Sequence, residues 1–178
     1  MARRVVHTIG HSTRPIGELV DLLRRNGIDT LVDIRTVPKS RHNPQFEARR
    51  LEQSLEEAGI EYRYAPELGG LRRPAKDSIN TGWRNSSFRA YADYMQSDAF
   101  AQAVDALAAL ASTRRPAIMC AEAVPWRCHR SLVGDALLVR GVDVLDIIDG
   151  SSPRPHKLTP FAKVDGTRIT YPAAGKSG

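Results

Sequence analysis

Short apolar runs alternate with longer amphipathic runs along most of this chain, and this alternation constrains the fold more than any other feature. The apolar runs are typical of buried strands, at residues 5–9, 30–35, 61–64, 116–119 and 142–148. The amphipathic runs repeat apolar residues at helical spacing, at residues 16–23, 46–58, 87–95, 98–111 and 128–140. Strands that alternate with helices form parallel βαβ units with right-handed crossovers. The pattern therefore predicts an α/β fold: a single three-layer domain with a mainly parallel sheet flanked by helices.

The chain is long enough for one hydrophobic core, because 42% of its 178 residues are hydrophobic. No internal repeat or linker divides it, so we expect one domain over residues 1–172 and a flexible tail over residues 173–178. Near the end of the domain, two β-prone runs flank Asp165-Gly166, which predicts a hairpin-like C-terminal segment. Residues 68–85 lack periodicity, so we expect a long loop of the kind that often covers a functional site.

Charge and targeting features narrow the class of protein. No apolar run approaches the roughly 20 residues of a transmembrane helix, and residues 1–6 lack the features of a signal peptide. We therefore expect a cytoplasmic protein with reduced cysteines and no membrane partner. The net charge of +6 favours an anionic partner, either a small molecule or a nucleic acid. The same arginines also fit a simpler role in solubility and in pairing with helix dipoles.

Both cysteines of the chain lie in the segment 118–130. A thiol and a carboxylate, Cys120 and Glu122, follow an apolar run, and a second thiol, an imidazole and a guanidinium open the next helix at residues 128–130. Proteins of the α/β class bind ligands beyond the carboxyl ends of their strands. This strand-to-helix switch is therefore predicted to form part of a functional site.

Two further strands also end in polar residues. The first predicted strand is followed by His11 and Ser12, and the second ends with Asp33 and Arg35. Because the carboxyl ends of parallel strands share one edge, we expect these side chains to meet the 118–130 segment in one crevice. Each residue also has a structural interpretation: Ser12 as a helix cap, Asp33 as an ion-pair partner of Arg35, and His11 as a buried, hydrogen-bonded histidine.

Five separated motifs add a resemblance to a known family. They are Thr8-Ile9-Gly10-His11-Ser12, Leu31-Val32-Asp33-Ile34-Arg35, Leu68-Gly69-Gly70, Tyr91 with Met95, and Met119-Cys120-Ala121-Glu122 followed by Cys128-His129-Arg130. In this order they resemble a bacterial family labelled domain of unknown function 488, and the resemblance covers nearly the whole chain. It implies a compact α/β domain in soluble prokaryotic proteins. It supplies no activity, so the chemistry has to come from the residues.

The polar residues of the crevice favour carboxylate-centred chemistry. We predict that Asp33 and Glu122 act as acid and base, with His11 and Cys120 as further catalytic candidates. The substrate-binding candidates are Ser12, Arg35, Arg41, Cys128, His129 and Arg130. Guanidinium groups among them match phosphate or carboxylate groups bidentately. The predicted function is hydrolysis or glycosyl transfer on a phosphorylated, nucleotide or nucleic-acid substrate.

Three other interpretations stay open. In a thiol-dependent enzyme, Cys120 would be the nucleophile near His129 and Arg130. However, the spacing from Cys120 to Arg127 is longer than the spacing from cysteine to arginine in the anion-binding loop of cysteine phosphatases. In a metal-dependent enzyme, thiolate and imidazole groups would bind zinc or an iron–sulfur centre, but closely spaced cysteine pairs are absent and we predict no metal ligands. The third is a non-catalytic module that binds nucleic acid or nucleotides. No cofactor or oligomeric state follows from the sequence.

The two cysteines are expected to differ in acidity. Cys128 falls at the start of a predicted helix, where the helix dipole and neighbouring basic groups lower a thiol pKa. Cys120 ends a strand and is expected to be buried. An exposed Cys128 sulfur would therefore have the lower pKa of the two.

Overall fold

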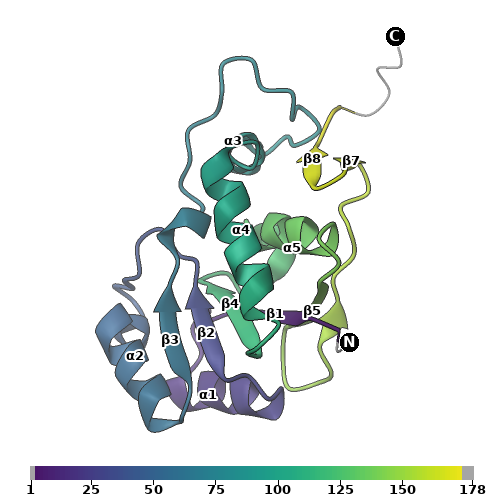
Figure 1. Cartoon of the computed structure of the whole chain (residues 1–178). Coiled ribbons are helices and arrows are strands. Elements are labelled where there is room, and N and C mark those ends of the chain that lie inside the picture. The colour runs from purple at the N-terminus through teal and green to yellow at the C-terminus, as the bar shows by residue number, and fades with distance from the viewer. Residues whose placement is uncertain (1–2, 174–178) are drawn as a thin grey trace.

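The computed structural model describes residues 3–173 of the chain (Figure 1). Its strands are β1 (Val5–Gly10), β2 (Thr30–Asp33), β3 (Glu61–Tyr64), β4 (Pro116–Cys120), β5 (Asp143–Ile147), β6 (Arg154–Pro155), β7 (Lys163–Asp165) and β8 (Arg168–Thr170). Its α-helices are α1 (Ile16–Arg25), α2 (Ala48–Glu57), α3 (Ser86–Tyr94), α4 (Asp98–Leu110) and α5 (Arg130–Leu138). Short 3-10 helices form at Pro44–Phe46, Pro66–Leu68 and Pro125–Arg127. The predicted tail lies, apart from Ala173, outside the described residues.

The main sheet has the strand order β3-β2-β4-β1-β5-β6. Its first five strands pair in parallel, and only the short β6 is antiparallel to its neighbour β5. The predicted α/β fold with a mainly parallel sheet is confirmed, as is the C-terminal hairpin, formed by β7 and β8. Because β4 lies between β1 and β2, their carboxyl ends meet at one edge, as the sequence predicted.

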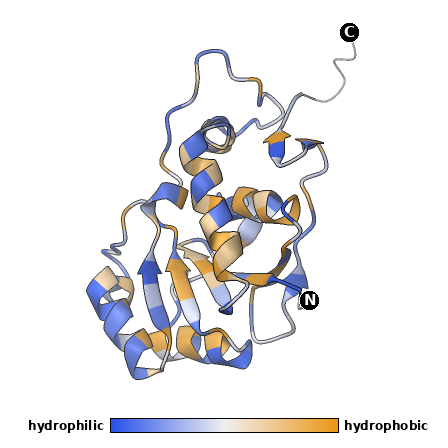
Figure 2. Cartoon of the chain, viewed as in Figure 1, coloured by the Kyte–Doolittle hydropathy of each residue, from blue (hydrophilic) through white to orange (hydrophobic). Residues whose placement is uncertain are grey.

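Two apolar clusters fill the space between the sheet and the helices, one on each face (Figure 1). Successive residues of a strand point to opposite faces, so Ile118 of β4 packs in the cluster of α3, α4 and α5, whereas Met119 packs in that of α1 and α2. Figure 2 shows that β2 is largely hydrophobic and the edge strand β3 largely hydrophilic. Burial on both faces therefore produces the three layers.

The long loop predicted at residues 68–85 is held by buried polar contacts. The Asp93 carboxylate on α3 accepts hydrogen bonds from the backbone N–H of Ala75, the Ser78 hydroxyl at 2.6 Å and the Asn80 amide at 2.7 Å. Asn80 is fully buried and accepts a bond from the Tyr171 backbone. The loop is thus fastened both to α3 and to the C-terminal segment.

Two element boundaries differ from the sequence prediction near the crevice. The second strand ends at Asp33 rather than Arg35, and α5 begins at Arg130 rather than Cys128. The helix starts later because Pro125–Arg127 forms a 3-10 turn and Cys128 is extended, with φ −139°. Within residues 3–173, no helix is both long enough and apolar enough to cross a membrane.

A candidate thiol site at the carboxyl edge of the sheet

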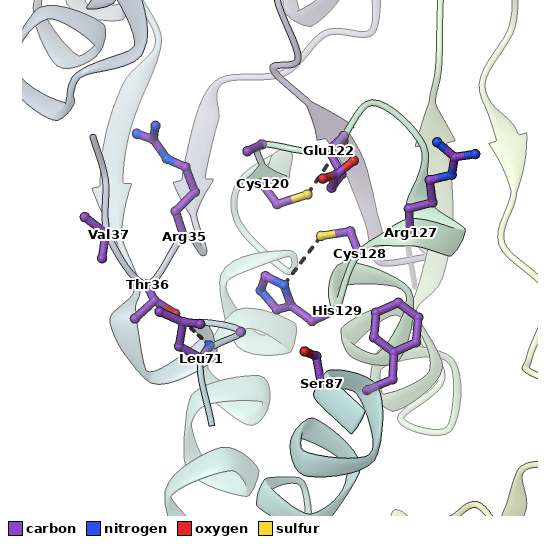
Figure 3. A pocket seen from close by; sticks show the side chains of 13 residues that line it. Arg35, Thr36, Val37, Leu71, Ser87, Cys120, Glu122, Arg127, Cys128 and His129 are labelled. Atoms are coloured by element: carbon purple, nitrogen blue, oxygen red, sulfur yellow. Dashed lines mark hydrogen bonds between the residues drawn. The ribbon is translucent and has the colours of Figure 1, made fainter. Parts of the chain in front are cut away.

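A cavity of about 330 Å³, here called the thiol cavity, opens where β2 and β4 end and α5 begins (Figure 3). It is lined by Arg35, Thr36, Val37, Gly70, Leu71, Ser87, Phe88, Cys120, Ala121, Glu122, Arg127, Cys128 and His129. These residues come from five separate parts of the chain. Figure 3 shows both sulfur atoms directed toward the centre of this group. The two thiols are therefore the reactive groups that the cavity encloses.

Cys120 is the last residue of β4 and is 2% exposed. Its Sγ lies 2.8 Å from Nη1 of Arg130. Burial opposes ionisation of this thiol, but a hydrogen bond from Cys128 and the positive charge of Arg130 outweigh it and lower the pKa to about 7. The Arg130 guanidinium thus favours the thiolate, the nucleophilic form of cysteine.

Arg130 is fully buried, and every nitrogen of its guanidinium is engaged. Nε donates to the Thr8 hydroxyl at 3.2 Å, Nη1 donates to Cys120 Sγ and to the Glu122 carbonyl, and Nη2 donates to the Ala123 carbonyl at 3.1 Å. Within residues 3–173 no carboxylate contacts this guanidinium directly. The prediction that Arg130 binds substrate is not supported, because Arg130 instead fixes the 120–123 loop and balances the Cys120 thiolate.

Cys128 is also buried, at 5% exposure, and its pKa is raised well above the ordinary thiol value. Burial is the main cause, and the neighbouring Cys120 thiolate adds to it. The predicted lower pKa of Cys128 required an exposed sulfur, and this condition is not met because Cys128 is buried. Cys128 precedes the helix by two residues, and its sulfur faces an anion rather than solvent.

His129 holds the two sides of the cavity together. Its Nε2 lies 3.1 Å from the Ile34 carbonyl, to which it can only donate, and its Nδ1 lies 3.4 Å from Cys128 Sγ. Burial lowers the pKa of His129 to about 4, so the ring is neutral at neutral pH. Gly70 packs against this ring so closely that a Cβ there would lie 2.7 Å from Nδ1. The double glycine in the Leu68-Gly69-Gly70 motif thus permits the long loop to close over His129.

Gly10 provides a second close approach, at the end of β1. A Cβ at this position would lie 1.5 Å from the carbonyl oxygen of Glu122. Only glycine therefore allows the 120–123 loop to cross β1 and present its carbonyl groups to Arg130.

Asp33, predicted to be a catalytic carboxylate, is fully buried behind the cavity. Its Oδ1 accepts from the backbone and Nε of Arg35, and its Oδ2 accepts from Nη2 of Arg35 and from the Tyr62 hydroxyl, each at 3.1 Å or less. These bonds occupy both oxygens. Asp33 therefore acts as the ion-pair partner that orients Arg35, the structural interpretation of this residue.

His11 and Ser12 belong to the support of the cavity rather than to its wall. Nδ1 of His11 lies 2.9 Å from the Ser12 carbonyl, and Nε2 lies 3.4 Å from Nη1 of Arg35. The ring stacks on Phe46 with centroids 4.3 Å apart, and burial is the main cause of its lowered pKa. Ser12 occupies the tight turn after β1, at φ 47°.

Of the predicted site residues, the structure brings Arg35, Cys120, Glu122, Cys128 and His129 into the cavity wall. His11, Asp33 and Arg130 lie buried behind it, and Ser12 and the exposed Arg41 do not line it. The remaining lining residues were not predicted as site residues; they are Thr36, Val37, Gly70, Leu71, Ser87, Phe88, Ala121 and Arg127. Gly70, Ala121 and Arg127 had a signal, because they lie in motifs or in the 118–130 segment. Thr36, Val37, Leu71, Ser87 and Phe88 reach the cavity through contacts between distant parts of the chain.

Within residues 3–173, no group of three or more histidine, cysteine or acidic side chains is arranged to hold a metal ion. At the cavity, the Cys120 thiol lies against the buried Arg130 guanidinium, and Arg127 lines the wall.

Comparison with known proteins places the chain in a family. A family model described as domain of unknown function DUF488 matches residues 15–137. No curated protein and no solved structure matches the chain. The matched range covers more than half of the chain and runs from α1 into the last turn of α5, including the whole 118–130 segment. The protein therefore belongs to the DUF488 family.

Proposed function

We propose that this protein is a thiol-dependent enzyme that acts on an anionic small molecule, with Cys120 as its nucleophile. The contact between Cys120 Sγ and the fully buried Arg130 guanidinium, at 2.8 Å, carries this proposal. A buried thiol beside a fixed positive charge is held as a thiolate, and thiolates are the reactive form in covalent catalysis.

Features of the cavity wall support an anionic substrate. Arg127 is exposed and lines the cavity, whereas the Arg35 guanidinium is paired with Asp33. A volume of about 330 Å³ lies within the usual range for small-molecule sites, about 300–1,000 Å³. This favours a small phosphorylated or carboxylated compound over a nucleic-acid strand.

The proposed reaction has two steps. The Cys120 thiolate donates an electron pair to an electrophilic carbon or phosphorus of the substrate, and the bond to the leaving group breaks. The leaving group departs with its bonding pair and takes a proton from water at the cavity mouth. Water then attacks the cysteine-linked group, loses a proton and returns Cys120 to the thiolate. The Glu122 carboxylate, exposed at the cavity, is our candidate for the base that accepts this proton.

Carboxylate-centred catalysis by Asp33 and Glu122 has weaker support. Both Asp33 oxygens are committed to Arg35 and Tyr62, so Asp33 has no free oxygen with which to act on a substrate. We therefore propose Glu122 as a general base in the thiol-dependent reaction, and not as one member of a catalytic carboxylate pair.

A charge-selective alkylation experiment tests the proposal. The measured quantity is the ratio of the modification rate with anionic iodoacetate to the rate with neutral iodoacetamide. We expect this ratio to be at least about fivefold higher for Cys120 than for free glutathione, since one charge pair contributes about 1 kcal/mol. Inorganic phosphate should slow this reaction. Peptide mass spectrometry after each treatment identifies the modified cysteine and its rate.

Matched variants separate a site from a general surface effect. Arg127→Ala should remove the preference for iodoacetate, whereas Arg115→Ala, which changes an exposed arginine at the opposite edge of the sheet, should preserve it. Equal selectivity for the two reagents, or faster modification of Cys128 than of Cys120, contradicts the proposal.

A further inference from the structure

A second cavity, of about 420 Å³, lies beside the carboxyl end of β5. We call it the aromatic cavity. It is separated from the thiol cavity by the Pro125–Arg127 turn, in which Trp126 lines the aromatic cavity and Arg127 lines the thiol cavity. None of the proposed thiol chemistry uses the second cavity. Its volume also lies within the usual range for small ligands, about 300–1,000 Å³.

Aromatic side chains form one part of its wall. Trp126 is 60% exposed, although tryptophan is among the side chains that gain most from burial. Trp83 and Phe161 also line the cavity and pack edge to face, with centroids 4.8 Å apart. The exposed face of the Trp126 indole at this cavity is a feature that a planar ligand would cover.

Positive charges form another part of the wall. Arg154 and Lys157 are exposed at the cavity, and neither side chain takes part in a hydrogen bond or an ion pair between described residues. The acidic side chain in the wall, Asp146, is already occupied, because it accepts from Thr8 at 2.6 Å and lies 3.4 Å from His156. The free charge facing a ligand is therefore positive.

We propose that the aromatic cavity is a binding site for a nucleoside phosphate or a closely similar aromatic anion. The base would stack on the exposed Trp126 indole, and the phosphate would lie against Arg154 and Lys157. Any nucleobase can stack on the tryptophan indole. The unpaired Arg154 and Lys157 side chains favour a phosphorylated ligand over an uncharged nucleoside. This site is independent of the reaction proposed for Cys120.

The two tryptophans of the chain, Trp83 and Trp126, both line this cavity, so intrinsic fluorescence reports directly on its occupancy. Adenosine 5′-monophosphate, adenosine and ribose 5-phosphate are titrated separately. We expect saturable quenching by the nucleotide, and binding at least about fivefold weaker for adenosine, which lacks the charge. Ribose 5-phosphate, which lacks the base, should bind about tenfold more weakly than the nucleotide.

Variants locate the ligand, with equilibrium dialysis of radiolabelled nucleotide as the common readout. Trp126→Ala should weaken nucleotide binding about tenfold. The Arg154→Ala, Lys157→Ala double variant should bind the nucleotide no better than adenosine. Lys163→Ala, at an exposed lysine of β7 outside both cavities, and Cys120→Ser should leave binding unchanged.

Three results would overturn the proposal. They are the absence of saturable nucleotide binding, equal binding of ribose 5-phosphate and the nucleotide, and undiminished binding by Trp126→Ala. Since Trp126 is largely exposed, its replacement should preserve the fold, which circular dichroism verifies.

Discussion

Two cysteines of nearly equal burial differ in acidity because of one buried guanidinium. Arg130 directs Nη1 at Cys120, while its backbone N–H approaches Cys128 Sγ at 3.4 Å. Cys128 is then left beside a thiolate, which raises its pKa. The sequence placed both thiols and the guanidinium at one site. It could not predict which thiol ionises, because that depends on where the 3-10 turn ends and the helix begins.

A buried histidine also shapes the response of the protein to pH. His156 lies 2.9 Å from Asp135 and 3.4 Å from Asp146, and despite the opposing effect of burial these carboxylates raise its pKa from 6.5 to about 9. His156 could not be predicted from the sequence, because it belongs to no recognisable motif. Its two partners lie far away in the sequence, on α5 and β5.

We predict that His156 stabilises the fold at low pH more than at high pH. Its folded pKa exceeds its unfolded pKa, so its contribution is fully present below pH 6.5 and is lost as the pH rises through about 9. The shift corresponds to at most about 3 kcal/mol. Urea unfolding of wild type and His156→Gln at about pH 6 and about pH 10 measures it. The difference between the two proteins should shrink at high pH.

The comparison with His156→Gln is needed because Cys120 acts in the opposite direction. Its folded pKa is depressed, so its contribution is present at high pH and is lost as the pH falls through about 7. The contribution of Cys120 is common to both proteins, so it cancels in the difference between their free energies of unfolding. A stability difference that is constant across the pH range would exclude a charged His156 in the fold.

At the scale of elements, the alternation of strand-like and helix-like runs predicted the order of the α/β units and the edge at which polar residues gather. It did not predict how the connecting segments pack on that edge. The 68–85 loop shows no periodicity, yet Asp93 and Asn80 fix it, and it brings Gly70 over His129. Such contacts are between residues distant in sequence, so local pattern carries no information about them.

We predict that Gly10→Ala strongly destabilises the protein. The new methyl group would meet the Glu122 carbonyl at the end of β1, and the 120–123 loop would have to move. The free energy of unfolding should fall by about 1–3 kcal/mol, the usual cost of overpacking. Thermal or urea unfolding measures this change.

Gly17→Ala is the matched control. Gly17 is exposed near the start of α1, and a Cβ there meets nothing within 4 Å. Alanine favours a helix over glycine by up to about 1 kcal/mol, so this variant should be equally stable or more stable. Equal stability of the two variants would mean that the loop does not cross β1 as described.

At the scale of the whole molecule, the sheet order decides which chemistry is available. Placing β4 between β1 and β2 brings three strand ends together, as the sequence predicted. The direction of each side chain then decides its role. Asp33 turns back to Arg35 and Tyr62, whereas Cys120 lines the cavity. Sequence patterns therefore located the crevice, and three-dimensional packing decides which side chains line it, so our proposal rests on its thiol rather than on a carboxylate pair.

The most direct test of this account is a pH titration of thiolate absorbance in the ultraviolet. The Cys128→Ser variant keeps Cys120 as its one thiol, and its new hydroxyl can donate a hydrogen bond in place of the Cys128 thiol. The Cys120→Ser variant keeps Cys128 as its one thiol. We predict a transition near pH 7 in Cys128→Ser, absent from Cys120→Ser and shifted upward when Arg130→Met is added. A Cys128→Ser protein that ionises only at or above pH 9, or a transition near pH 7 that persists in Cys120→Ser, would contradict Cys120 as the nucleophile.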